Sequence, residues 1–244
     1  MRRFVKLSIL LTIITQFLSA QEIQFGFGSG IGTYIMSDLK NLNNKISKGT
    51  SFETKTVSDF PPYWYYRPSL ILKGTNFGFG LCYNFESTGS RISSKDYSGE
   101  YRFDMKINAN TPCIYAEYDI PLFNNFKVGF YSLAGLVFTN LTMNEYLRVN
   151  DSTLTNSTYK FDVFNEILEP GIEINYKIMF IGLKLNVGYL FQAKDDAFSN
   201  DQTGNSNINL NTVKSNWNGY RIGLSIFYNL AFKAKKEKIN SDIK

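Results

Sequence analysis

The side chains that could do acid–base chemistry in this chain are carboxylates, because its 244 residues include no histidine. Glu169 and Glu173 form the candidate pair, since they fall on the same face of one predicted strand. At a strand rise of about 3.3 Å per residue they lie roughly 13 Å apart, which is too far to share a proton. A hydrolase that depends on a histidine base is excluded as well. We therefore expect no catalytic residue, no cofactor and no metal ligand in this chain.

Two cysteines, Cys82 and Cys113, flank the shortest of the long connections. If this hairpin is regular, residues whose numbers add up to 195 face each other and the turn centres on Tyr97 and Ser98. The register pairs Cys82 with Cys113, Arg91 with Asp104 and Lys95 with Glu100. Its two opposite-charge pairs favour it. The thiols could then close a cross-strand disulfide, or stay free if Pro112 introduces a bulge that shifts the register.

Charged residues gather on one face of the predicted strands, where every second residue points the same way. The nine members of this set are Arg67, Lys73, Glu86, Glu117, Lys127, Glu169, Glu173, Lys184 and Arg221. Nine charges cannot form the core of a soluble sandwich, but they can line a narrow lumen if they pair. A selective pore lined by the same charges is the alternative, although eight strands leave little path for water.

Glycine occupies alternate positions in the segment EIQFGFGSGIGTYIM, residues 22–36. Large apolar residues such as Phe25 and Phe27 fall on the opposite face. The glycine face includes Gly26, Gly28, Gly30 and Gly32. An eight-stranded barrel has an interior just wide enough for side chains. We therefore predict that these glycines face the lumen and leave room for the long charged residues of other strands.

Eight stretches show this period of two. They are 22–36, 64–73, 77–86, 113–120, 126–138, 168–176, 181–192 and 220–230. The connections alternate between short ones at 74–76, 121–125 and 177–179 and long polar ones near 37–62, 87–100, 142–158 and 193–216. The pattern predicts an all-β fold, an eight-stranded antiparallel up-and-down transmembrane β-barrel with short periplasmic turns and long extracellular loops.

Aromatic residues near the strand ends suit the two membrane interfaces. They are Trp64, Tyr66, Tyr118, Tyr176, Tyr189, Tyr220 and Tyr228. A secreted, lipocalin-like barrel is the soluble alternative, with the apolar face turned inward and the charges outward. The uneven loops and the charge-free aromatic face argue against it.

Both ends of the chain differ from the middle. Residues 1–20 contain a basic start and a short apolar run that predict a cleaved signal peptide, too short to span a membrane as a helix. The barrel is expected over 21–232, and 233–244 form a lysine-rich periplasmic tail. Because the excess of basic residues lies in these two ends, nucleic-acid binding is not expected.

The chain resembles small outer-membrane β-barrel proteins of the OmpA/OmpX-like class in its glycine-alternating first strand and its final strand. Residues 111–138 look like the PorT-like outer-membrane barrel-domain group. In that group a proline-containing strand, a short turn and a YxxAG strand follow in this order, and Tyr131, Ala134 and Gly135 match the last motif. The final strand resembles a barrel assembly signal, carried by Arg221, Gly223, Ile226 and Tyr228. The resemblance implies a bacterial outer-membrane location, with lipid, the barrel assembly machinery and other envelope proteins as partners.

These observations predict a non-enzymatic scaffold whose extracellular loops contact surfaces or partners. The PorT-like resemblance implies a second role, as a subunit of an outer-membrane secretion or assembly machine. A narrow channel or a lumenal binder of a small ligand is the third alternative.

Overall fold

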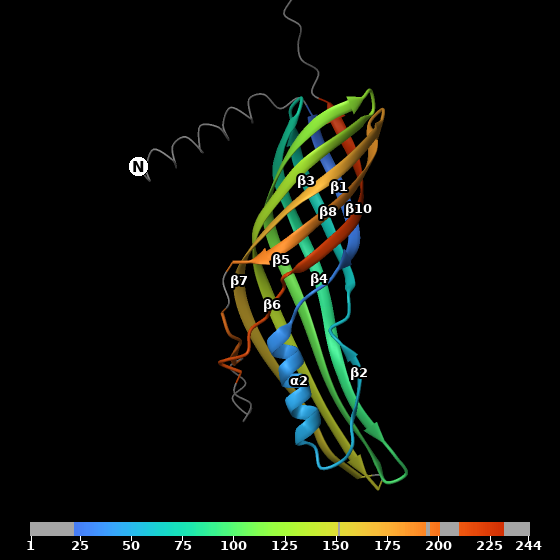
Figure 1. Ribbon diagram of the computed structural model, residues 1–244, viewed down its shortest axis with the longest axis vertical. Coiled ribbons are helices and arrows are strands. Elements are labelled where there is room, and N and C mark those ends of the chain that lie inside the picture. The colour runs from blue at the N-terminus through green and yellow to red at the C-terminus, as the bar shows by residue number, and fades with distance from the viewer. Residues whose placement is uncertain (1–21, 151, 194–195, 201–209, 232–244) are drawn as a thin grey trace, which may run out of the picture.

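Eight antiparallel strands close into a ring in the computed structural model, which describes residues 22–150, 152–193, 196–200 and 210–231 (Figure 1). The ring consists of β1 (Glu22–Gly32), β3 (Tyr63–Lys73), β4 (Phe77–Lys95), β5 (Gly99–Phe123), β6 (Phe126–Val149), β7 (Ser152–Ile178), β8 (Ile181–Gln192) and β10 (Gly219–Ala231). Each pairs with its neighbour in the chain order, and β10 returns to β1 in a register from Glu22↔Ala231 to Gly32↔Arg221. The predicted eight-stranded up-and-down barrel is confirmed. The predicted signal peptide and tail lie outside the described residues.

The register of the β4–β5 hairpin is the predicted one. Cys82 faces Cys113, Arg91 faces Asp104 and Lys95 faces Glu100. Arg91 donates two hydrogen bonds to Asp104, which raise the pKa of this extracellular guanidinium. Pro112 causes no bulge, because the pairing with β4 runs through it, although its pairing with β6 is interrupted. Both thiols are free, as in the second alternative, although Pro112 does not shift the register as that alternative assumed.

The strands have two lengths, and this difference shapes the molecule. β4, β5, β6 and β7 have 19, 25, 24 and 27 residues, whereas the other four strands of the ring have 11 to 13. The long strands therefore continue past the barrel as a curved sheet, which we call the extension (Figure 1). β6 alone runs eleven residues beyond Phe138, to Val149, or roughly 36 Å at about 3.3 Å per residue.

The predicted long loops are wrong in detail because of this extension. Most of 87–100 and 142–158 is strand, and tight turns remain at 96–98 and at Asn150. The segment 37–62 contains α2 (Ser37–Gly49) and β2 (Lys55–Asp59), which pairs with β4. The segment 193–216 contains β9 (Ser199–Asn200), which pairs with β7.

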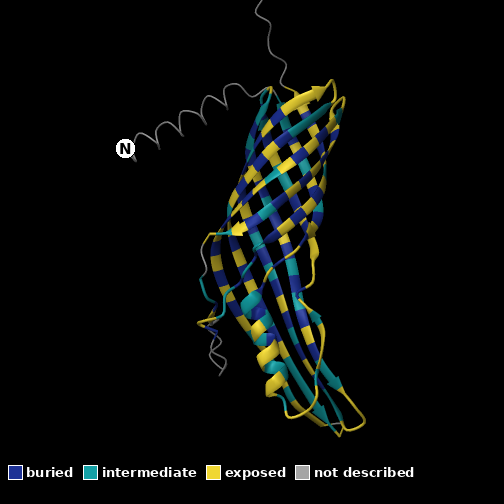
Figure 2. Cartoon of the chain, in the orientation of Figure 1, coloured by how far each residue is buried: buried dark blue, intermediate teal, exposed yellow. Residues whose placement is uncertain are grey.

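The polarity of the two sheet faces reverses between barrel and extension, as β5 shows. In the extension its buried side chains are apolar, namely Tyr101, Phe103, Met105, Ile107 and Ala109, while polar residues such as Arg102 and Lys106 face outward. In the barrel its buried side chains include Glu117 and Asp119, while Ile114, Tyr118 and Ile120 face outward. Figure 2 shows the strict alternation of buried and exposed residues along the strands in both parts. The extension therefore has an ordinary water-excluding core, and the barrel has the inverse arrangement.

The helix α2 covers the apolar face of the extension (Figure 1). Leu39, Leu42 and Ile46 recur at helical spacing, so that one face of α2 is apolar. Leu39 is fully buried, and Leu42 and Ile46 pack against the same hydrophobic cluster. Among the described residues, no helix is long and apolar enough to cross a membrane.

The outer face of the barrel is apolar and exposed. Leu81, Phe130 and Ile226 are 58–61% exposed although they are large hydrophobic residues. Of the seven aromatic residues predicted at the interfaces, Trp64, Tyr66, Tyr118, Tyr176, Tyr220 and Tyr228 are exposed, and Tyr189 is half-buried. Such a continuous apolar surface on a closed ring is stable against hydrocarbon and not against water.

Candidate functional site

The lumen contains the predicted charge network, with one addition. Eight of the nine predicted charges are buried inside the barrel, and Lys127 lies half-exposed at its short-turn end. The sequence reasoning left out Asp119, which is also buried and accepts a hydrogen bond from Lys73 at 2.7 Å. With Asp119 included, five cations meet five carboxylates, so the inner network is electrically neutral. The network divides into two groups.

The first group lies towards the extension and is organised around Glu169. Its carboxylate accepts hydrogen bonds from Arg67 at 2.8 and 2.9 Å, from Arg221 at 2.7 Å and from the Tyr131 hydroxyl at 2.8 Å. Arg221 also pairs with Glu86. Glu169 is thus shared by two arginines, and Arg221 bridges it to Glu86 through two different nitrogens, which a guanidinium group with several donors allows.

The second group lies towards the short turns. Glu117 pairs with both Lys73 and Lys184, and Lys184 also lies 3.4 Å from Glu173. Tyr115 donates a hydrogen bond of 2.6 Å to Glu173. Glu169 and Glu173 therefore belong to different groups, so the structure brings together no carboxylate pair from these two residues.

The glycines of β1 make room for tyrosines and serines rather than directly for the charged side chains. A Cβ atom on Gly30 would meet the Tyr65 ring and the backbone of β10, and one on Gly32 would meet Tyr34. On Gly26 and Gly28 it would meet the hydroxyls of serines on the two neighbouring strands. Tyr65 in turn lies against the guanidinium groups of Arg67 and Arg221 at 5.2 and 5.4 Å. The prediction that these glycines face the lumen is confirmed, while their effect on the charges is indirect.

The middle of the lumen is closely filled. The cavity lined by Arg67, Tyr115, Lys184 and their neighbours has a volume of only about 20 Å³. Towards the extension, the buried Trp217 packs edge-on against Tyr34 at 4.8 Å and donates a hydrogen bond to Thr139. Salt bridges and this apolar layer therefore lie in series along the barrel axis.

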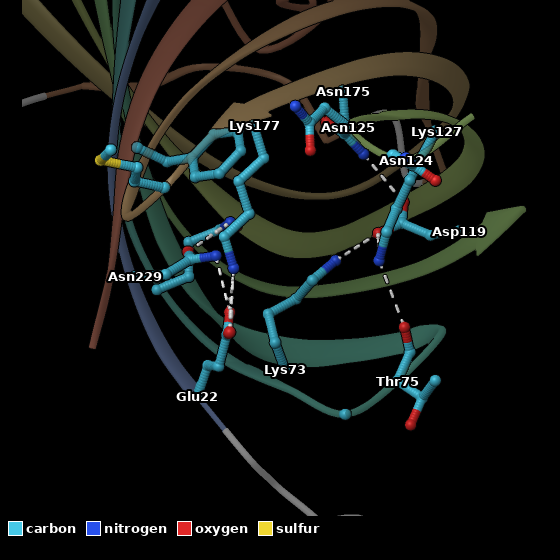
Figure 3. A pocket seen from close by; sticks show the side chains of 14 residues that line it. Glu22, Lys73, Thr75, Asp119, Asn124, Asn125, Lys127, Asn175, Lys177 and Asn229 are labelled. Carbon is cyan, nitrogen blue, oxygen red and sulfur yellow. Dashed lines mark hydrogen bonds and ion pairs between the residues drawn. The ribbon is translucent and has the colours of Figure 1, made fainter. Parts of the chain in front are cut away.

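A larger cavity of about 410 Å³ opens at the short-turn end (Figure 3). Two ion-paired clusters face each other across it. In one, Lys177 donates to both oxygens of Glu22 at 2.8 and 2.9 Å. In the other, Lys73 and Lys127 lie 2.7 and 3.8 Å from Asp119. The sequence reasoning missed this cavity, although its turn residues are polar and rich in asparagine.

The residues that resemble an assembly signal divide between the two faces of β10. Arg221 and Gly223 point into the lumen, whereas Ile226 and Tyr228 are exposed on the outer face. That the barrel assembly machinery recognises these residues stays a prediction. Within the described part of the chain, no group of three or more His, Cys, Asp or Glu side chains could hold a metal ion.

No protein-family model matches the chain, and no curated protein matches it in sequence. Several solved outer-membrane structures resemble its fold. The outer membrane protein OprG from Pseudomonas aeruginosa has 13% identity and a TM-score of 0.48 over 88% of this chain and 98% of that one. Neisserial surface protein A has 12% identity and a TM-score of 0.38, over 86% and 97%. The attachment invasion locus protein Ail of Yersinia pestis, solved with a heparin analogue, has 11% identity and a TM-score of 0.40, over 86% and 99%.

The closed ring, its apolar outer face and its ion-paired lumen establish the class of the fold independently of these likenesses. In such a ring every strand pairs with a neighbour on both sides and no edge strand is left open to hydrocarbon. It is a small eight-stranded transmembrane barrel of the bacterial outer-membrane type, with its short turns periplasmic and its long hairpins outside.

Proposed function

We propose that the protein is a non-enzymatic outer-membrane barrel whose extension contacts partners at the cell surface. The observation that carries this proposal is the extension itself. It has its own apolar core, helix α2 covers that core, and its four long strands continue directly from the barrel wall. A binding surface on such a scaffold is held in place more firmly than one on irregular loops.

The far end of the extension offers the contact surface. Tyr97 is fully exposed in the β4–β5 turn, and Leu154 is 63% exposed at the start of β7. Neither side chain lies on the lipid-facing part of the barrel. Tyrosine is among the residues enriched at the energetic centres of protein interfaces, and the exposed Leu154 adds apolar surface at the same end.

Site-specific photo-crosslinking in whole cells tests this role. A photoreactive phenylalanine analogue replaces Tyr97 or Leu154. The same replacement at Lys106, on the outward face of the extension and away from its tip, is the matched control. We expect a defined crosslinked product from one or both tip positions and none from position 106. If cells that display the protein yield no product from either tip position, the contact role is wrong.

The channel alternative predicts a different measurement. Because the lumen is filled by paired charges around a cavity of about 20 Å³, we expect no unitary conductance in planar bilayers. Stepwise conductance from the refolded protein would favour the channel.

The role in a secretion or assembly machine stays a prediction, and co-purification of other envelope proteins in mild detergent tests it.

A further inference from the structure

The cavity at the periplasmic end has no part in the contacts proposed for the extension. It lies at the opposite end of the barrel, among the short turns (Figure 3). Its volume of about 410 Å³ falls in the range of small-molecule sites. Eleven of its fourteen lining residues are polar or charged, which favours a ligand with polar groups.

Two lysines of its wall reach the surface, but only one of the two carboxylates beside them is buried. The side chains of Lys127 and Lys177 are each 34% exposed, whereas that of Asp119 is 2% exposed. Lys177 is engaged by both oxygens of Glu22. Because the Glu22 side chain is 29% exposed and pairs with Lys177, the uncompensated positive charge at the cavity surface is that of Lys127.

Lys127 makes the fewest hydrogen bonds of the three lysines in this wall. Among the described residues its ammonium group makes one hydrogen bond, of 3.2 Å to the carbonyl of Thr75. Its nearest carboxylate oxygen, on Asp119, is 3.8 Å away and beyond hydrogen-bond distance. Since an ammonium group has three donors, two remain for a ligand. Asn124 and Asn125 stand exposed in the adjoining turn.

A second polar side chain of the same wall is buried without a full set of partners. Asn175 is buried, and its Nδ2 donates to Asp119 at 2.8 Å and to Glu173 at 3.1 Å. These two carboxylates fix the orientation of the amide, because a flipped amide would turn its oxygen towards them. The Oδ1 atom consequently has no hydrogen-bond donor among the described residues. A buried acceptor of this kind normally has a partner in proteins.

We propose that this cavity binds a small carboxylate-bearing molecule that also carries amide or hydroxyl groups. The ligand carboxylate pairs with Lys127. The exposed amides of the turn, Asn124 and Asn125, recognise the neutral polar groups. This chemistry occurs at the end of a short peptide and in an acidic sugar.

Titration of the detergent-solubilised full mature chain with three probes tests the proposal. The first probe, N-acetyl-dialanine, offers a carboxylate and two amides. The second is the same dipeptide with its C-terminal carboxylate converted to an uncharged amide. The third, glucuronate, offers a carboxylate on a sugar. We expect saturable binding of at least one acid. The uncharged amide should bind about tenfold more weakly than N-acetyl-dialanine if the peptide binds, the equivalent of about 1.4 kcal/mol.

Lys127→Gln should weaken binding of the acid about fivefold, because the exposed ammonium group is partly screened by solvent. Lys106→Gln, at the other end of the molecule, is the matched control and should leave it unchanged. Preference for N-acetyl-dialanine assigns the peptide as the source, and preference for glucuronate assigns the sugar. The proposal is overturned if neither acid saturates, if the uncharged amide binds as well as N-acetyl-dialanine, or if Lys127→Gln binds like the wild type.

Discussion

Replacing Glu169 by glutamine should destabilise the barrel strongly, because this residue holds two buried arginines. Its side chain is 0% exposed and accepts hydrogen bonds from Arg67, Arg221 and Tyr131. In Glu169→Gln the shape is kept, but Glu86 is left as the single carboxylate near two guanidinium groups. The local charge changes from zero to plus one in a closely packed lumen.

The size of the effect follows from the burial of the group. Removing one partner of a buried ion pair typically costs about 3–5 kcal/mol, since the other charge stays desolvated and unpaired. We expect a loss in this range for Glu169→Gln. Total stabilities of domains are about 5–15 kcal/mol, so the change is a large fraction of the whole.

Guanidinium unfolding of the protein refolded into lipid vesicles provides the assay. The two tryptophans report on different parts, since Trp217 is fully buried and Trp64 is 53% exposed on the barrel surface. The matched control is Glu53→Gln at an exposed position, which should change the free energy of unfolding by less than about 0.5 kcal/mol.

A double variant separates charge imbalance from loss of packing. Arg67→Gln combined with Glu169→Gln leaves Arg221 and Glu86 as a balanced pair. The combined loss should therefore be smaller than the sum of the single losses by at least about 1 kcal/mol. If the free energy of unfolding of Glu169→Gln lies within about 1 kcal/mol of the wild-type value, the lumen is a wet, high-dielectric space. The interpretation of the lumen as closed by a neutral network of buried ion pairs is then refuted.

Three further predictions address the close packing of β1, the core of the extension and its response to pH. Gly30→Val should abolish refolding, because the valine side chain would meet the backbone of β10, and the loss is seen as loss of heat-modifiable gel mobility. Ser29→Val, at the neighbouring outward position, should be tolerated. Equal behaviour of the two variants would contradict the packing argument. Leu39→Asp should open the extension to proteases while the barrel stays resistant, whereas exposed Asn41→Asp should not; an unchanged digestion pattern would mean that α2 is not anchored by this residue. Burial, and to a smaller extent a nearby glutamate, raises the pKa of the extracellular Tyr101 from 10.0 to about 12. Between these values the folded state binds a proton that the unfolded state has released, so the extension should lose stability as pH rises from about 10 to about 12. Tyr101→Phe should reduce this loss in pH-dependent proteolysis, and an identical pH profile would exclude Tyr101 as its source.

The barrel strands could be predicted because their two faces differ in both size and charge. Two opposite-charge pairs, Arg91 with Asp104 and Lys95 with Glu100, favour the register that the whole hairpin adopts. The nine charged residues were placed in the lumen by alternation alone. Asp119 was left out of that set although it alternates with them, so its omission was avoidable.

The extension was missed for a physical reason. Residues 99–110 alternate as strictly as the barrel strands do, but their polar side faces outward and their apolar side inward. A segment with many polar residues is interpreted as a loop when the apolar face is expected on the outside throughout. It is recognised as a strand only if the apolar face can change from the outside to the inside along the same strand. Leu39, Leu42 and Ile46 carried a helix signal within a segment that was also interpreted as a loop.

Contacts across the lumen could not be predicted from the sequence. Arg221 pairs with Glu86, yet β10 and β4 are not neighbours in the ring. Such pairings depend on the diameter of the closed ring and on the tyrosine and glycine residues that set the space inside it. The periplasmic cavity depends on the same closure, because its walls come from turns far apart in the chain.

The reversal of polarity along β5 also determines how deep the molecule sits in the bilayer. If the barrel sank, Lys106 and its outward neighbours would enter hydrocarbon, where cationic side chains cost up to about 2–4 kcal/mol each at the midplane. If it rose, Ile114 and the other outward apolar residues nearest the extension would meet water instead of lipid. Both displacements cost free energy, so the reversal of polarity along the long strands fixes the position of the barrel along the membrane normal. The tip of the extension is thereby held at a constant height above the cell surface.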